Sequence, residues 1–247
     1  MLAQDSASDR VPGPPGGTAC LHTAGKWGTF ERVRIVTLVP DGTKTNTRHP
    51  ETDKEGIMAY SEKHVPGIFH NRAERYQYET FVRYKHKGRY TPISWREMQE
   101  RVRRTALGLI SLGLEPHDMV GIFSENCWEW IVADLATLSI GCTDAPIYAT
   151  NSGVEAAYIM NDSKTKVLFV QGKEHLERVL SVRPKLETVR SIVTFEPVEG
   201  APDDVMSLDE LMARGSAYAD QDAFENRLNA VRPEDLAPVF PMNLIEQ

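Results

Sequence analysis

DMVGIFSENCWEWIVADLATLSIGCTDAPIYAT, from Asp118 to Thr150, contains two short apolar runs separated by a longer segment that is apolar on nearly every face. The two runs cover residues 119–123 and 145–149, and their length is typical of buried β-strands. The segment between them, residues 127–140, has the length of a helix and few polar residues, so we expect a helix that is buried on most sides. Strand, buried helix and strand form a βαβ unit, in which the two strands are parallel and the crossover is right-handed.

Both ends of this buried helix carry sequence signals. Asn126 is a candidate N-cap, and Glu129, three residues later, completes the pattern of a capping box. Gly141 follows the helix at a position where a positive φ is accessible without a Cβ. We therefore expect the helix to begin after Asn126 and to stop before Gly141.

The same pattern continues toward the C-terminus. Apolar runs at 167–171 and 191–195 extend the series, and the four strand starts lie 22 to 26 residues apart. Capping boxes at Ser152–Glu155 and Ser207–Glu210 predict two further helices, the second of which is expected to end at Gly215. This alternation predicts an α/β fold with a doubly wound, mostly parallel sheet and helices on both of its faces.

The segments around this repeat are also patterned. Residues 66–76 have helical spacing, and two strand-like runs bracket a turn at Lys87-Gly88, which predicts a β-hairpin. A capping box at Ser94–Glu97 then starts an amphipathic helix that ends near Gly113. Residues 219–230 are a candidate for a final helix.

Composition divides the chain into three segments. Residues 1–57 are rich in Pro, Gly and polar residues around one isolated strand-like run at 30–39, and we expect this segment to be disordered or a spurious upstream extension. Residues 58–237 carry the α/β pattern, and Met58 is a second candidate start beside Met1. Residues 238–247 do not continue the pattern.

Composition also excludes several classes of function. The formal net charge of −7 and the pI of about 5.6 provide no global field that favours nucleic acid. No apolar run approaches the roughly 20 residues of a transmembrane helix, which leaves peripheral membrane association open. Cys20, Cys127 and Cys142 have no C-x-x-C spacing, so they predict neither a disulfide framework nor a zinc site and fit a reducing, cytoplasmic location.

A search for catalytic and binding motifs identifies no site. Gly25-Lys26 is followed by Trp27 where a phosphate-binding P-loop needs Ser or Thr, and no G-x-G-x-x-G follows a predicted strand. Ser124 follows a strand but lacks the G-x-S-x-G frame of a nucleophile elbow. None of the histidines has metal-ligand spacing; they are His22, His49, His64, His70, His86, His117 and His175. The sequence predicts no catalytic, cofactor-binding or metal-ligating residue in this chain.

Three stretches together resemble the AMP-forming acyl-CoA synthetases of the adenylate-forming superfamily. TPISWREM at 91–98 resembles the first core motif, and LATLSIGCTDAPIYAT at 135–150 resembles the second. PEDLA at 233–237 resembles the segment before the phosphate loop. The PIYAT ending and Asn161-Asp162-Ser163 are most similar to the long-chain fatty acid branch, and the resemblance covers residues 66–237.

The resemblance implies an ATP-dependent ligase that adenylates a fatty acid and then transfers the acyl group to CoA, with Mg²⁺ bound to the phosphates. After Ala237 the family pattern of a strand and a phosphate loop is replaced by PVFPMNLIEQ. No family catalytic residue can be carried onto this chain, and we expect a truncated, inactive N-terminal part of such an enzyme. The alternative is a non-catalytic α/β binding or interaction module.

Overall fold

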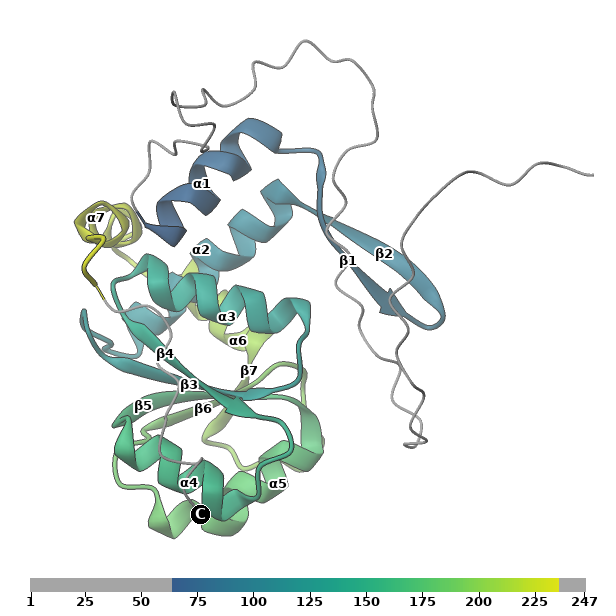
Figure 1. The fold of residues 1–247 in the computed structure, drawn as a ribbon, viewed down its shortest axis with the longest axis vertical. Coiled ribbons are helices and arrows are strands. Elements are labelled where there is room, and N and C mark those ends of the chain that lie inside the picture. The colour runs from purple at the N-terminus through teal and green to yellow at the C-terminus, as the bar shows by residue number, and fades with distance from the viewer. Residues whose placement is uncertain (1–63, 236–247) are drawn as a thin grey trace, which may run out of the picture. The chain divides into compact units, whose positions relative to one another are not determined.

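A five-stranded parallel sheet forms the centre of the protein in the computed structural model, which describes residues 64–235 (Figure 1). Its strands lie in the order β4-β3-β5-β6-β7, and every neighbouring pair is parallel. The strands are β3 (Met119–Ser124), β4 (Thr143–Tyr148), β5 (Thr165–Val170), β6 (Ser191–Thr194) and β7 (Val205–Ser207). The four strands expected from the sequence are confirmed, whereas the three-residue edge strand β7 was not predicted.

Helices cover both faces of this sheet, as predicted for a doubly wound fold. Figure 1 shows α2, α3 and α6 on one face and α4 and α5 on the other. The helices are α1 (Val65–Tyr76), α2 (Trp95–Ser111), α3 (Trp128–Ser139), α4 (Gly153–Asp162), α5 (Gly172–Val182), α6 (Leu208–Ser216) and α7 (Ala223–Ala230), with a 3-10 turn η1 (Arg183–Lys185) after α5.

Alternation along the strands produces two apolar cores. In β3, Ile122 belongs to the core beneath α2 and α3, whereas its neighbour Phe123 belongs to the core beneath α4 and α5. Phe169 and Leu168 divide in the same way in β5. Successive side chains of a strand point to opposite faces, so a sheet covered on both sides needs apolar residues at every position.

Three of the four predicted capping boxes are present. In each box the serine hydroxyl oxygen accepts a hydrogen bond from the backbone N–H of the third helical residue, and the glutamate carboxylate accepts one from the backbone N–H of the serine. The three boxes are Ser94–Glu97, Ser152–Glu155 and Ser207–Glu210. The box predicted at Asn126 is wrong, because the N-cap of α3 is Cys127, which makes no side-chain capping bond. With the cap one residue later, Glu129 is the second helical residue and cannot close a box.

Gly215 does not end α6, contrary to the prediction, since the helix continues to Ser216. A Cβ at Gly215 would lie 1.9 Å from the carbonyl oxygen of Arg104, and one at Gly108 would lie 2.5 Å from the carbonyl oxygen of Leu211. These two glycines let the backbones of α2 and α6 touch. Gly141, by contrast, has the positive φ of 73° expected after α3.

The predicted hairpin is a separate two-stranded antiparallel sheet of β1 (Thr80–His86) and β2 (Arg89–Ser94). It extends away from the helices in Figure 1. The inner face is anchored by Val82 and Ile93, which pair across the strands and are both 2% exposed. The strand-like run expected at 30–39, the segment 1–57 and the tail 238–247 lie outside the described residues.

Candidate functional site

The carboxyl ends of the parallel strands are the first place to look for a ligand site. In open α/β sheets, ligands bind where successive crossovers leave in opposite directions, because the loops there diverge and open a crevice. The chain passes from β3 to β4 on one side and then returns to β5 on the other. The switch point of this sheet therefore lies between β3 and β5.

Hydrogen bonds close this switch point. The backbone N–H of Gln171, just after β5, donates to the carbonyl oxygen of Phe123 over 3.1 Å. The backbone N–H of Glu125 donates to the Gln171 side-chain oxygen over 2.8 Å. The Ser124 hydroxyl donates to the Glu125 carbonyl over 2.8 Å. The first of these bonds continues the ladder between β3 and β5, and the other two join polar groups just beyond the strand ends to one another.

Helix α5 fixes the loop that follows β4. Nη1 of Arg178 donates to the carbonyl oxygens of Ala149 and Asn151 over 2.8 and 3.1 Å. A ring nitrogen of His175 lies 3.1 Å from the same Ala149 oxygen, and the imidazole stacks edge-on against Phe123 with 4.8 Å between ring centroids. The part of the sequence that resembles the second synthetase motif is thus held in place by two side chains from the next βα unit.

A shallow depression of about 450 Å³ lies beyond β5 and β6. It is lined by Lys173, Glu196, Pro197, Val198 and Glu199. Two carboxylates against one ammonium group oppose the binding of a triphosphate. Among the first two residues after each of β3, β4, β5 and β6, the only glycine is Gly172. The described strand ends therefore do not supply the glycine-rich loop that brings several N–H groups to phosphates. The described residues therefore do not fit ATP by themselves.

Neither Ser124, which the sequence analysis tested as a nucleophile, nor the two described cysteines are activated. Ser124 uses its hydroxyl in the backbone bond described above. Cys127 is 4% exposed, and burial raises the pKa of its thiol. Burial also raises the pKa of the Cys142 thiol to about 12, and this thiol donates to the Glu115 carbonyl. Thiols held neutral at physiological pH are inert as nucleophiles.

The described histidines act as structural groups or lie apart from one another. His70 is 7% exposed, lies 3.1 Å from the Ser139 hydroxyl and contacts the Phe224 ring edge-on. Burial lowers the pKa of its imidazole to about 4, so it is neutral. Within residues 64–235, no three His, Cys, Asp or Glu side chains are grouped to hold a metal ion. His22 and His49 lie outside the described residues.

One buried carboxyl pair was missed by the sequence reasoning. Asp144 in β4 is fully buried, and none of the described residues donates a hydrogen bond to either of its side-chain oxygens. Burial, and then the charge of Asp134 in α3, raises the pKa of Asp144 to about 8. Burial raises the pKa of Asp134 to about 6. The sequence feature that could have predicted this buried carboxyl is Asp144 itself, directly before the apolar run at 145–149. A parallel sheet covered on both faces buries that position.

Comparison with known proteins identifies the family. Residues 69–239 match the family described as AMP-binding enzyme. This range is most of the chain and nearly the range over which the synthetase motifs were recognised. The chain belongs to this family.

Curated relatives extend the similarity to acyl-CoA ligases. The chain is 30% identical over 154 residues to long-chain-fatty-acid–CoA ligase ACSBG2 of Mus musculus, covering 62% of this chain and 23% of the relative. It is 32% identical over 153 residues to long-chain-fatty-acid–CoA ligase FadD15 of Mycobacterium bovis, covering 62% of this chain and 24% of that relative. The chain thus spans about a quarter of the length of the curated relatives that it matches.

Solved structures confirm the fold. A mutant form of coronafacic acid ligase from Pectobacterium brasiliense superposes with a TM-score of 0.60 at 19% identity, over 72% of this chain and 33% of that one. A long-chain-fatty-acid–CoA ligase from Archaeoglobus fulgidus superposes with a TM-score of 0.52 at 21% identity, over 64% of this chain and 31% of that one.

The helices within residues 64–235 include none with the length and apolar character that a membrane span requires.

Proposed function

We propose that this chain is the N-terminal part of an ATP-dependent long-chain fatty acid–CoA ligase. The observation that carries the proposal is the family match over residues 69–239, together with relatives named as long-chain-fatty-acid–CoA ligases. In this proposal residues 58–237 are the family segment, which the match over residues 69–239 supports. The substrates are a fatty acid, ATP with Mg²⁺, and CoA.

The reaction joins a carboxylate to a thiol in two steps. The fatty acid carboxylate attacks the α-phosphate of ATP and releases pyrophosphate, because a carboxylate oxygen leaves readily only as part of AMP. The CoA thiol then displaces AMP. In this scheme the described residues form a rigid sheet that positions the loops after β3, β4 and β5, while the phosphate-binding and catalytic groups come from outside residues 64–235. In this proposal residues 64–235 contribute no catalytic, cofactor-binding or metal-binding side chain.

The test measures the 247-residue chain directly. Calorimetric titration with ATP and Mg²⁺ is expected to show no micromolar binding, and pyrophosphate release with palmitate is expected to equal a buffer blank. Tight binding or turnover above the blank would show that the site lies within this chain.

A chimera tests the scaffold role separately. Residues 64–235 replace the corresponding part of the Mycobacterium bovis relative, and palmitate-dependent pyrophosphate release is measured with the unaltered relative as control. Activity is expected in the chimera. A folded chimera that binds ATP but does not turn over would contradict the proposed role.

A non-catalytic α/β binding module is the second candidate. The bonds that Glu125 forms with Gln171 and Ser124 favour it, because they occupy polar groups at the strand ends, where ligands of such sheets bind. The same chimera discriminates the two, since a module adapted to another task would not support ligation. We also propose a cytoplasmic location, which the free and buried Cys127 and Cys142 support.

A further inference from the structure

The hairpin β1–β2 concentrates positive charge in an acidic protein. Between Thr80 and Ser94 there are four Lys or Arg residues and no Asp or Glu, whereas the whole chain has a net charge of −7. The four are Arg83, Lys85, Lys87 and Arg89. We name this segment the basic hairpin.

The basic hairpin has a polar outer face and an apolar inner face. Cross-strand neighbours share a face, so the pair Lys85–Tyr90 and the pair Arg83–Pro92 lie opposite to the buried pair Val82–Ile93. On the inner face, Tyr84 contacts the ring of Trp128 in α3 with 6.2 Å between centroids. The inner face therefore fixes the hairpin to the body, and the outer face carries Arg83 and Lys85. Lys87 lies in the turn, and Arg89, opposite His86, lies on the other face next to the turn.

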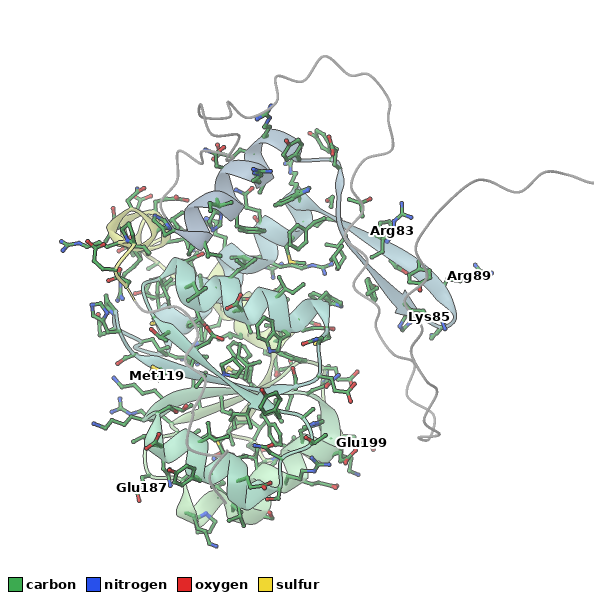
Figure 2. The ribbon with its side chains drawn as sticks, in the orientation of Figure 1. Arg83, Lys85, Arg89, Met119, Glu187 and Glu199 are labelled. Atoms are coloured by element: carbon green, nitrogen blue, oxygen red, sulfur yellow. The ribbon has the colours of Figure 1, made fainter. Side chains whose placement is uncertain are left out.

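Arg83, Lys87 and Arg89 are available to a partner. Figure 2 shows Arg83 and Arg89 extending outward from the hairpin. Within residues 64–235, Arg83, Lys87 and Arg89 form no ion pair. Tyr90 follows Arg89, pairs with Lys85 across the strands and is 51% exposed. An exposed tyrosine among cations combines an apolar ring with a polar hydroxyl, which suits the headgroup region of a bilayer.

The turn of the basic hairpin carries a lysine at a position of positive φ. Lys87 has φ of 47° and Gly88 has φ of 79°, as in a two-residue type I′ turn. Asn or Gly is favoured at the first of these positions, and a residue with a long side chain is uncommon there. Backbone conformation therefore does not favour a lysine at Lys87, the residue of the turn that lies farthest from the body of the protein.

We propose that the basic hairpin docks the protein on anionic phospholipid membrane surfaces. The geometry selects a planar partner. At about 3.3 Å per residue, the turn at Lys87 lies about 10 Å beyond the Tyr84–Trp128 contact, slightly more than the screening length of about 8 Å at physiological salt. The tip thus reaches a flat surface while the acidic body stays screened from it. An extended nucleic acid, in contrast, would also meet the acidic body and be repelled.

The test is cosedimentation of the full chain with vesicles. Binding is expected to vesicles of phosphatidylcholine with about 30% phosphatidylserine, but not to pure phosphatidylcholine, and should be lost at about 0.5 M salt. Each basic residue near such a surface contributes about a fivefold gain in partitioning. The triple variant Arg83→Gln/Lys87→Asn/Arg89→Gln should therefore bind about 100-fold more weakly. Asn suits the turn, so the hairpin is expected to stay folded.

A matched control separates local from global charge. Lys185→Gln/Arg190→Gln/Arg214→Gln changes the net charge by the same amount at exposed positions away from the hairpin and should bind like the unaltered chain. Equal loss in both triple variants, or binding to neutral vesicles, would overturn the proposal. Hairpin-dependent binding to single-stranded RNA that outcompetes the vesicles would overturn it in favour of a nucleic-acid partner. The readout is independent of ligase activity, so it stands or falls separately from the proposed function.

Discussion

Replacing Asp144 by asparagine should make the protein more stable at alkaline pH. Asp144 lies fully buried in β4 beside Asp134 of α3, and none of the described residues donates a hydrogen bond to its carboxylate. Burial raises the pKa of both carboxyl groups, to about 8 for Asp144 and about 6 for Asp134. At neutral pH the folded pair therefore keeps one proton. The protonated carboxyl can then donate a hydrogen bond to the ionised one.

The magnitude follows from proton linkage. In the unfolded chain both groups titrate at about 3.9, so above about pH 5 the folded protein binds more protons than the unfolded one. The stabilisation due to raised pKa values is fully present below the unfolded pKa and is lost as pH rises through about 6 and about 8. A difference of one proton lowers the free energy of unfolding by about 1.4 kcal/mol per pH unit. Between about pH 6 and pH 8 the unaltered protein should lose about 3 kcal/mol.

The side-chain amide introduced by Asp144→Asn cannot ionise and can donate to the Asp134 carboxylate. The variant should therefore be nearly insensitive to pH in this window and exceed the unaltered protein by about 2 to 3 kcal/mol at about pH 8. The assay is urea unfolding followed by circular dichroism at several pH values between about 5 and about 8, the window in which the pair titrates. Asp203→Asn, at an exposed position, is the control and should preserve the original slope. Parallel pH profiles for the Asp144 variant and the unaltered protein would refute the reasoning.

Three further substitutions test the packing and the local electrostatics. Gly215→Ala should lower the free energy of unfolding by at least about 2 kcal/mol in urea titrations, because its Cβ would overlap the carbonyl oxygen of Arg104. Ser152→Ala removes the side-chain cap of α4 and should cost about 1 kcal/mol, measured by thermal unfolding. The pKa of His70 is lowered to about 4 by burial, so its contribution to stability is present above about pH 6.5 and is lost as pH falls toward 4. His70→Gln, which retains a donor for Ser139, should show a smaller loss over that acidic range, whereas an unchanged loss would contradict this assignment.

The sheet was predictable because its signals are local. The strands β3 to β6 follow from apolar runs with regular spacing, and the serine of each confirmed capping box lies within three residues of its glutamate. The same locality explains the errors. β7 has three residues and is defined by its pairing with β6, so periodicity could not reveal it. The cap of α3 shifted by one residue to Cys127, a residue that carries no capping signal.

Features that depend on contacts between distant residues were not predictable. In the sequence, Gly215 looks like a residue that ends a helix. In the structure it allows α6 to pack closely against α2, a contact that the sequence alone does not reveal. Asp134 and Asp144 are separated by the end of α3 and a turn, and their burial is set by elements from elsewhere in the chain. The candidate site shows the same limit: Gln171 reaches Glu125 across 46 residues of sequence, and only the parallel pairing of β3 with β5 brings them together.

The closed switch point links the sequence reasoning to the proposed function. A loop built to receive phosphates presents unpaired N–H groups, which are costly when buried and are tolerated only where a ligand satisfies them. Here the amides of Glu125 and Gln171 are paired internally, at 2.8 and 3.1 Å. The Gln171 bond continues the ladder between β3 and β5, whereas the Glu125 bond to the Gln171 side chain lies beyond the strand ends, where a ligand would have to replace it. With these two amides paired, the proposed ligase needs phosphate donors from outside residues 64–235, whereas the alternative binding module needs none, and the chimera separates the two.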